Sequence, residues 1–192
     1  MIRLPAAPKQ LRAIGFDDGP HRRLRGSKVD LVGVVTSGTR FEGMVRGTIR
    51  KDGDTATQTL VDLLGHSKFA SQVHLVLLDG IAFGGLNVVD LPALHEACGK
   101  PCIAVMRRLP DMTAMRRAIG RLPRPARRLD RIARAGPIHR ASSLFFQVCG
   151  LDSATTAAAL ARITDRGHIP EPIRLAHHIA AAIADGQSRG RA

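Results

Sequence analysis

The sequence contains no tryptophan and no tyrosine, and it has six phenylalanines and three cysteines among 192 residues. Any stacking of nucleic-acid bases on aromatic side chains would therefore have to use phenylalanine. Cys98, Cys102 and Cys149 are too few and too scattered for a disulfide framework, and the first two lack the second pair that a zinc ribbon needs. We expect three reduced cysteines in the core of a cytoplasmic protein.

Long apolar runs are also missing. No stretch of about 18 uncharged apolar residues occurs, which excludes a membrane-spanning helix. The first residues lack the apolar segment of a secretory signal. The length suits one domain over residues 1–192 with an adequate core, ending in a frayed tail at 186–192.

Negative charge is in short supply. Lys and Arg number 29 against 16 Asp and Glu, which gives a net charge of +13. Eleven of the arginines fall between Arg107 and Arg140. Codon bias could raise the number of arginines, but it would not cluster them in one segment. Such a patch favours nucleic acid as the partner, because each neutralised phosphate releases counterions. We expect sequence-independent contacts to the nucleic-acid backbone from Arg107, Arg108, Arg116 and Arg117.

The order of strand and helix patterns predicts an α/β fold. Alternating or buried apolar runs at 11–16, 29–37 and 41–50 predict an antiparallel meander of three strands. A helix follows to about residue 66, capped by Asp54 or Thr55. Strands at 73–78, 101–106 and 144–149 then alternate with helices at 89–97, 112–134 (interrupted), 152–163 and 173–184. This order predicts a ribonuclease-H-like mixed sheet, with parallel strands after the meander and helices on both faces.

Acidic residues follow the predicted strands at three points. Asp17 ends the first strand, Asp54 begins the first helix, and Asp79 ends the fourth strand. If the first and fourth strands are parallel neighbours, Asp17 and Asp79 meet at the sheet edge where ligands bind. Paired carboxylates bind hard divalent ions, which can activate a water for phosphodiester hydrolysis. The sequence therefore predicts an Mg²⁺ or Mn²⁺ site.

Each of these acids also has a plain structural explanation. Asp before Gly is a common turn pair, and Asp54 could serve as a helix cap. Because the three acids occur together in a very basic chain, we favour metal ligation for Asp17 and Asp79. For Asp54, metal ligation and a helix cap are equally good explanations. Asp18 is a weaker candidate for a second ligand, since adjacent residues of a strand point to opposite faces.

Glycines and histidines allow two readings. Gly80, Gly84 and Gly85 could let a flipped-out base approach the backbone, or the last two could form a tight turn. For His177 in the last predicted helix we favour a structural position in the core or at its boundary.

Several motifs together resemble one family. These are residues 16–20 (FDDGP), 79–81 (DGI), 87–90 (NVVD), 99–101 (GKP) and 169–177 (IPEPIRLAH). They resemble the domain-of-unknown-function family distantly related to endonuclease V, also called endonuclease dU, over about residues 12–191. The resemblance implies a ribonuclease-H-like fold, dependence on Mg²⁺ or Mn²⁺, and cleavage of strands that carry deoxyuridine or a similar deaminated base.

The resemblance also implies roles for particular residues. Asp17 and Asp79 resemble the two metal-binding aspartates of endonuclease V. Asp54 falls where that enzyme has a metal-binding Glu, although Asp52 could be aligned instead. Arg107 stands where it has a Lys facing the scissile phosphate, and an arginine can hold a phosphate with two parallel hydrogen bonds.

Two expected features are missing. Endonuclease V has a catalytic His in a Gly-His pair after its last strand, whereas Gly150 is followed here by Leu151; Asp152 or His177 could compensate. Its Tyr-containing wedge has no counterpart.

The hypothesis is a metal-dependent endodeoxyribonuclease with catalytic residues Asp17, Asp54, Asp79 and Arg107. An inosine-directed RNA nuclease, a silent nucleic-acid-binding protein and a small-molecule hydrolase remain alternatives.

Overall fold

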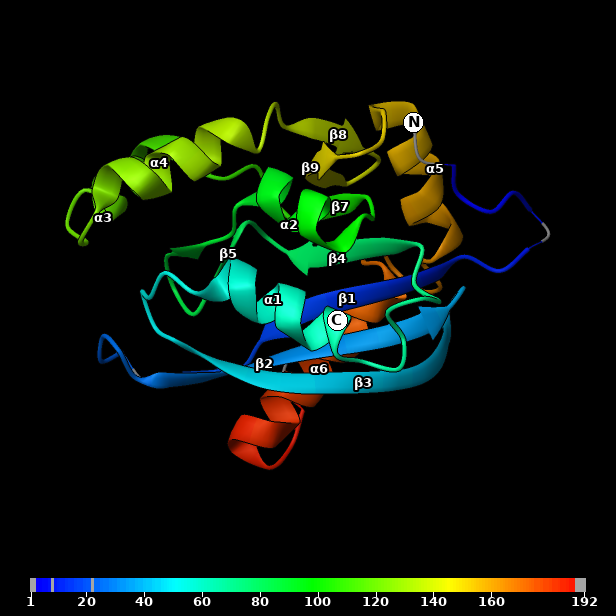
Figure 1. Cartoon of the computed structure of the whole chain (residues 1–192), viewed down its shortest axis with the longest axis horizontal. Helices are drawn as coiled ribbons and strands as arrows, with labels where there is room; N and C mark the ends of the chain where they lie inside the picture. Colours follow the sequence, from blue (N-terminus) through cyan, green and yellow to red (C-terminus); the bar gives the residue numbers. More distant parts are fainter. Residues whose placement is uncertain (1–2, 8, 22, 189–192) are drawn as a thin grey trace.

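A computed structural model describes residues 3–7, 9–21 and 23–188, which form one central sheet covered by helices on both faces (Figure 1). The strands of this sheet are β1 Arg12–Asp18, β2 Lys28–Ser37, β3 Arg40–Arg50, β4 Leu75–Asp79, β7 Cys102–Met106, β8 His139–Ala141 and β9 Leu144–Cys149. A separate hairpin pairs β5 Ala82–Phe83 with β6 Asn87–Val88. The helices are α1 Ala56–Gly65, α2 Leu91–Cys98, α3 Met112–Ile119, α4 Pro125–Arg134, α5 Ser153–Arg162 and α6 Glu171–Asp185.

The strand order of the main sheet is β3-β2-β1-β4-β7-β9-β8. β1, β2 and β3 form the predicted antiparallel meander, and β1, β4 and β7 are parallel neighbours. The carboxyl ends of β1 and β4 therefore lie side by side. In Figure 1 they point toward the side of the molecule that carries α3 and α4.

The far edge of the sheet differs from the predicted run of parallel strands. β9 pairs antiparallel with both β7 and β8. The pairing of β8 with β9 has a local cause: Ser142 and Ser143 alone join them, and a hairpin this short can connect only antiparallel strands. The three-residue strand β8 was not expected, because no strand was predicted between the helical segment ending at residue 134 and the strand at 144–149.

Two apolar layers hold the helices against the sheet. On one face, Phe16, Leu78 and their neighbours pack with Leu60 of α1 and Leu94 of α2, and Ile132 of α4 joins the same cluster. On the other face, Leu77 and Ile103 pack with Leu160 of α5. α6 also covers that face, where its alanines contact Val32 and Val34. The predicted arrangement with helices on both faces is confirmed (Figure 1).

α6 approaches β1 closely because β1 carries glycine at Gly15. A Cβ at this position would lie 2.6 Å from the backbone nitrogen of Ile173, well inside van der Waals contact. Glycine thus lets the first turn of α6 rest on the strand. This contact fixes the position of α6 along β1 and therefore determines which later side chains of α6 contact the strand.

The start of α1 and the end of the chain refine two predictions. Thr55 occupies the N-cap of α1 without a side-chain cap, and Asp54 does not cap either; instead Asn87 of β6 accepts a hydrogen bond from the Ala56 N–H at 3.0 Å. Residues 186–188 follow α6 without regular structure, and the remainder of the predicted tail, 189–192, lies outside the described residues. Among the described helices, none is long and apolar enough to cross a membrane.

Candidate metal centre

Asp17 and Asp79 meet at the carboxyl edge of the sheet, as predicted. Phe16 pairs with Leu78 in parallel register, so the two aspartates that follow lie on adjacent strands and on the same face. That face is the one covered by α6. Asp17 is 5% exposed, and the Asp79 side chain retains 20% exposure.

His177 of α6 completes the cluster. Its Nδ1 lies 2.8 Å from Asp17 Oδ2, and Asp17, Asp79 and His177 offer ligand atoms that all lie within 4.8 Å of one another. We expected a structural position for His177 in the core or at its boundary, whereas it contacts Asp17 and lies close to Asp79. Helical periodicity predicts which side of α6 a residue lies on. It does not predict which turn of α6 lies beside which residue of β1, because that depends on the packing of α6 over Gly15.

The electrostatics of the cluster favour a cation. Burial, together with the charge of Asp17, raises the pKa of Asp79 to about 6, against the opposing effects of Arg107 and His177. The hydrogen bond to Asp17 raises the pKa of His177 above its ordinary value. Two carboxyl groups held this close, away from bulk water, repel each other when both are ionised, and a divalent ion would relieve that repulsion. The donor set of the three side chains therefore fits a metal ion.

Asp18 lies on the opposite face from this cluster, as strand alternation requires. Burial and the charge of Asp17 raise the pKa of its carboxyl to about 6, while a backbone hydrogen bond from Gly84 and the nearby His21 act in the other direction. His21 Nδ1 lies 3.5 Å from Asp18 Oδ2. The structure thus gives Asp18 partners of its own and does not bring it into the group with Asp79.

Arg107 reaches the cluster from the end of β7. Its Nη2 lies 3.4 Å from Asp79 Oδ2, and its side chain is 38% exposed. An exposed ion pair at this distance is weak, so the Arg107 guanidinium remains free to bind an incoming anion. Arg107 therefore lies next to Asp79 at the carboxyl edge of the sheet.

Asp54 is surrounded by arginines. Its Oδ1 accepts a hydrogen bond from Arg131 at 2.5 Å, and its Oδ2 lies 3.0 Å from Arg127 and 3.9 Å from Arg124. Among the described residues, Asp54 does not join the candidate metal group. The predicted ligand set is therefore brought together at Asp17 and Asp79 but not at Asp54, because α4 neutralises the third carboxylate.

The α4 arginines behind Asp54 are buried. Arg128 is 3% exposed and donates to the backbone oxygens of Leu86, Asp52 and Gly53 at 3.1, 2.8 and 2.7 Å, with a further bond to Pro123. Arg131 adds a bond to the oxygen of Val88. These contacts clamp α4 onto the turn after β3 and onto the β5–β6 hairpin. The sequence pattern predicted a segment that faces solvent or nucleic acid, and the buried contacts of Arg128 and Arg131 were not expected.

The glycine-rich loop is held against the same turn. A Cβ at Gly85 would lie 2.4 Å from Asp52 Oδ1, which accepts a hydrogen bond from the Leu86 N–H. Gly84 and Gly85 have φ angles of +53° and +87° and form the bend between β5 and β6, which fits the tight-turn reading. Gly80 directly follows Asp79, has a φ of +86°, and has open space where a Cβ would stand.

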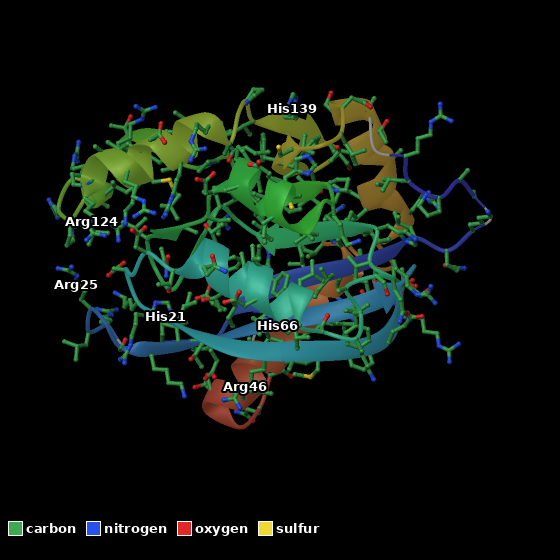
Figure 2. The ribbon with its side chains drawn as sticks, viewed as in Figure 1. His21, Arg25, Arg46, His66, Arg124 and His139 are labelled. Carbon is green, nitrogen blue, oxygen red and sulfur yellow. The ribbon has the colours of Figure 1, made fainter. Side chains whose placement is uncertain are left out.

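The exposed arginines gather at the same end of the molecule. Arg107, Arg108, Arg116 and Arg117 are all exposed, as are Arg121, Arg124 and Arg127 farther along. Figure 2 shows Arg124, from the start of α4, and Arg25, from the β1–β2 connection, at one end of the structure. β1 and β4 also end on the side of the molecule that carries α3 and α4 (Figure 1), so these arginines and the two aspartates lie toward the same end of the molecule.

Metal binding to this cluster should depend on pH. The pKa of Asp79 is raised from 3.8 to about 6 in the folded protein, so the metal-free fold loses stability as pH rises from about 4 to about 6. A divalent ion competes with the proton for Asp79. We therefore expect Mn²⁺ to raise the melting temperature clearly at pH 7.5 and far less at pH 5. Thermal scans at both pH values with Mn²⁺ or EDTA measure this; an equal shift at both would contradict it.

The comparisons with known proteins agree with this architecture. The crystal structure of a protein of unknown function from Archaeoglobus fulgidus superposes with a TM-score of 0.86 at 34% identity, covering 90% of this chain and 98% of that one. Endonuclease V of Ciona intestinalis, solved with a DNA containing an inosine followed by a ribo-adenosine, gives a TM-score of 0.56 at 18% identity and covers 91% and 87%. The fold is thus ribonuclease-H-like, with an acidic cluster at the carboxyl edge of its sheet.

A family model described as endonuclease dU matches residues 9–184. A UPF0215 protein of Methanothermobacter thermautotrophicus is 39% identical over 188 residues, which cover 95% of this chain and 92% of that protein. The chain belongs to the endonuclease dU family. The resemblance drawn from the sequence motifs is confirmed.

Proposed function

We propose that this chain is a divalent-metal-dependent endonuclease that hydrolyses a phosphodiester near a deaminated base in DNA. The observation that carries the proposal is the cluster of Asp17, Asp79 and His177 at the edge where β1 and β4 end. The exposed arginines beside it supply the surface for a polyanionic substrate. The family description, endonuclease dU, supports deoxyuridine as the base.

Asp17 and Asp79 would hold Mg²⁺ or Mn²⁺, ions that take carboxylate oxygens and retain positions for phosphate and water. When bound, the ion supplies Lewis-acid stabilisation of the charge that develops on the phosphate. Asp17 also orients His177 through the 2.8 Å contact at Nδ1. Proton transfer by this histidine would therefore use Nε2. His177 takes the place of the histidine that Leu151 does not provide.

Arg107 binds the phosphate next to the ion. Its guanidinium is within 3.4 Å of Asp79 and can present two parallel N–H donors to a phosphate. Arg108, Arg116 and Arg117 hold the flanking backbone without reading its sequence. Gly80 permits close approach of the damaged nucleotide to the backbone beside Asp79, and Gly84 and Gly85 shape the neighbouring loop.

DNA is favoured over RNA as the substrate. The description of the matching family names deoxyuridine, which supports DNA. The structural neighbour from Ciona intestinalis was solved with a DNA that contains an inosine followed by a ribo-adenosine. Asp54 has no assigned role with the ion in this proposal, because Arg131 and Arg127 already neutralise it.

The test is a cleavage assay on end-labelled strands that differ in one nucleotide: deoxyuridine, deoxyinosine, or inosine in RNA, with the unmodified base as the control. Each strand is incubated with the protein in Mg²⁺, Mn²⁺ or EDTA. We expect a cut near deoxyuridine or deoxyinosine in either metal and none in EDTA. Cutting confined to inosine in RNA would replace the DNA assignment, and binding without any cut would leave a silent nucleic-acid-binding protein.

A further inference from the structure

All three cysteines lie near one another on the face of the sheet that α2 covers, remote from the acidic cluster. Cys98 is the last residue of α2, and Cys102 is the first residue of β7. Cys149 of β9 pairs with Cys102 across the antiparallel strands. The acidic cluster stands at the opposite, carboxyl edge of the parallel strands. The proposed nuclease chemistry does not use these thiols, although all three pack within or against the apolar cluster under α2.

Two of the thiols are in direct contact. The Sγ atoms of Cys98 and Cys102 are 3.7 Å apart, and both sulfurs lie near the carbonyl oxygen of Lys100, at 3.7 and 3.4 Å. The turn between them explains the contact: Gly99 ends α2 with a φ of +63° and reverses the chain toward β7. Side-chain rotation that closes the sulfurs to about 2 Å would complete a disulfide.

We propose that Cys98 and Cys102 form a peroxide-reactive dithiol that closes reversibly to a disulfide. Cys98 is the half-buried partner, at the end of α2, and is therefore the more accessible of the two thiols to a small oxidant. Cys102 is fully buried behind it. The half-buried thiol of Cys98 is therefore the one oxidised first, and the buried thiol of Cys102 is positioned to resolve the product.

The chemistry balances with a hydroperoxide as the oxidant. The Cys98 thiolate attacks the O–O bond of hydrogen peroxide, forming an S–O bond and releasing hydroxide. The Cys102 thiol then attacks the sulfur of the resulting sulfenic acid, the S–O bond breaks, and water leaves as the S–S bond forms. Two thiols lose two electrons and two protons, and one peroxide is reduced to two waters.

The ionisation of the pair agrees with this division of roles. A hydrogen bond from Cys102 lowers the pKa of Cys98 to about 6, with help from the backbone at Lys100 and the nearby charges of His95 and Lys100. Burial raises the pKa of Cys102 well above its ordinary value. At neutral pH the negative charge therefore lies on Cys98, and the thiolate is the reactive form of cysteine.

Peptide mapping of the full chain can test the proposal directly. Lys100 is followed by Pro101, which blocks trypsin, so Cys98 and Cys102 share the tryptic peptide 69–107 while Cys149 lies in 141–162. After limited hydrogen peroxide, we expect two of the three thiols to be lost and peptide 69–107 to lose two hydrogens through an internal link that dithiothreitol reverses. A link between the two peptides, or three unreacted thiols, would overturn the proposal.

Single substitutions separate the roles of the thiols. Cys98→Ser should slow peroxide consumption at least about tenfold. Cys102→Ser should stop at a sulfenic acid on Cys98 that dimedone traps. Cys149→Ser is the matched control and should oxidise at the wild-type rate. Equal rates for all three variants would contradict the assignment, and none of these readouts depends on nuclease activity.

Discussion

Replacing Asp79 by asparagine is expected to reduce metal-dependent cleavage at least about a hundredfold, since even groups that only support metal ligands are worth about 10- to 100-fold. Asparagine keeps the shape of the side chain but removes the charge that binds the ion. Asp79 is 20% exposed at the end of β4, so the fold should tolerate the change. Binding to the damaged strand should persist, because it depends mainly on the arginines outside the cluster.

Single-turnover cleavage and fluorescence anisotropy, measured on the same deoxyuridine strand, separate these two quantities. Asp62→Asn is the matched control, because Asp62 lies on α1 and accepts a hydrogen bond from Gln58. It should cleave like the unmodified protein. If Asp79→Asn lost binding and cleavage equally, the residue would be holding the substrate or the fold and not the ion.

Replacing Arg128 by methionine should produce the largest loss of stability, about 3 kcal/mol, as expected when one member of a buried polar cluster is removed. Arg128 is 3% exposed and supplies hydrogen bonds to the turn after β3, to the β5–β6 hairpin and to Pro123. Methionine fills part of the volume but leaves these carbonyl oxygens without a donor. α4 should loosen from the sheet as a result.

Chemical unfolding with urea measures this loss. Arg127→Met is the control, since Arg127 also contacts Asp54 but its side chain is 57% exposed, and exposed ion pairs contribute at most about 1 kcal/mol. Equal destabilisation by the two substitutions would show that α4 is held by charge alone. A negligible effect at Arg128 would contradict the clamp.

Much of the fold could be read from the sequence because its strands are long and its turns are distinct. The strand at Leu144–Cys149 was located to the residue, and Asp17 and Asp79 were placed together from the order of the elements. These successes rest on local patterns plus one rule, that the ends of neighbouring parallel strands meet at a common edge.

The remaining features depend on contacts between distant segments. His177 meets Asp17 across 160 positions of the sequence, at a height fixed by the packing of α6 over Gly15. Asp54 looked like a ligand or a cap because no local signal shows that Arg131 reaches it from 77 positions away. The clamp by Arg128 was hidden for the same reason: a dense arginine segment looks solvated until tertiary structure buries part of it.

The most direct test of the central claim is a metal titration of single-turnover cleavage by protein first stripped with EDTA, using a strand with one deaminated base. The account predicts no cutting without metal, a saturable rise in rate with Mn²⁺, and no restored rate for Asp17→Asn at the same Mn²⁺ concentrations. Cutting that persists in EDTA, or that Asp17→Asn performs at the wild-type rate, would contradict a metal centre built on Asp17 and Asp79.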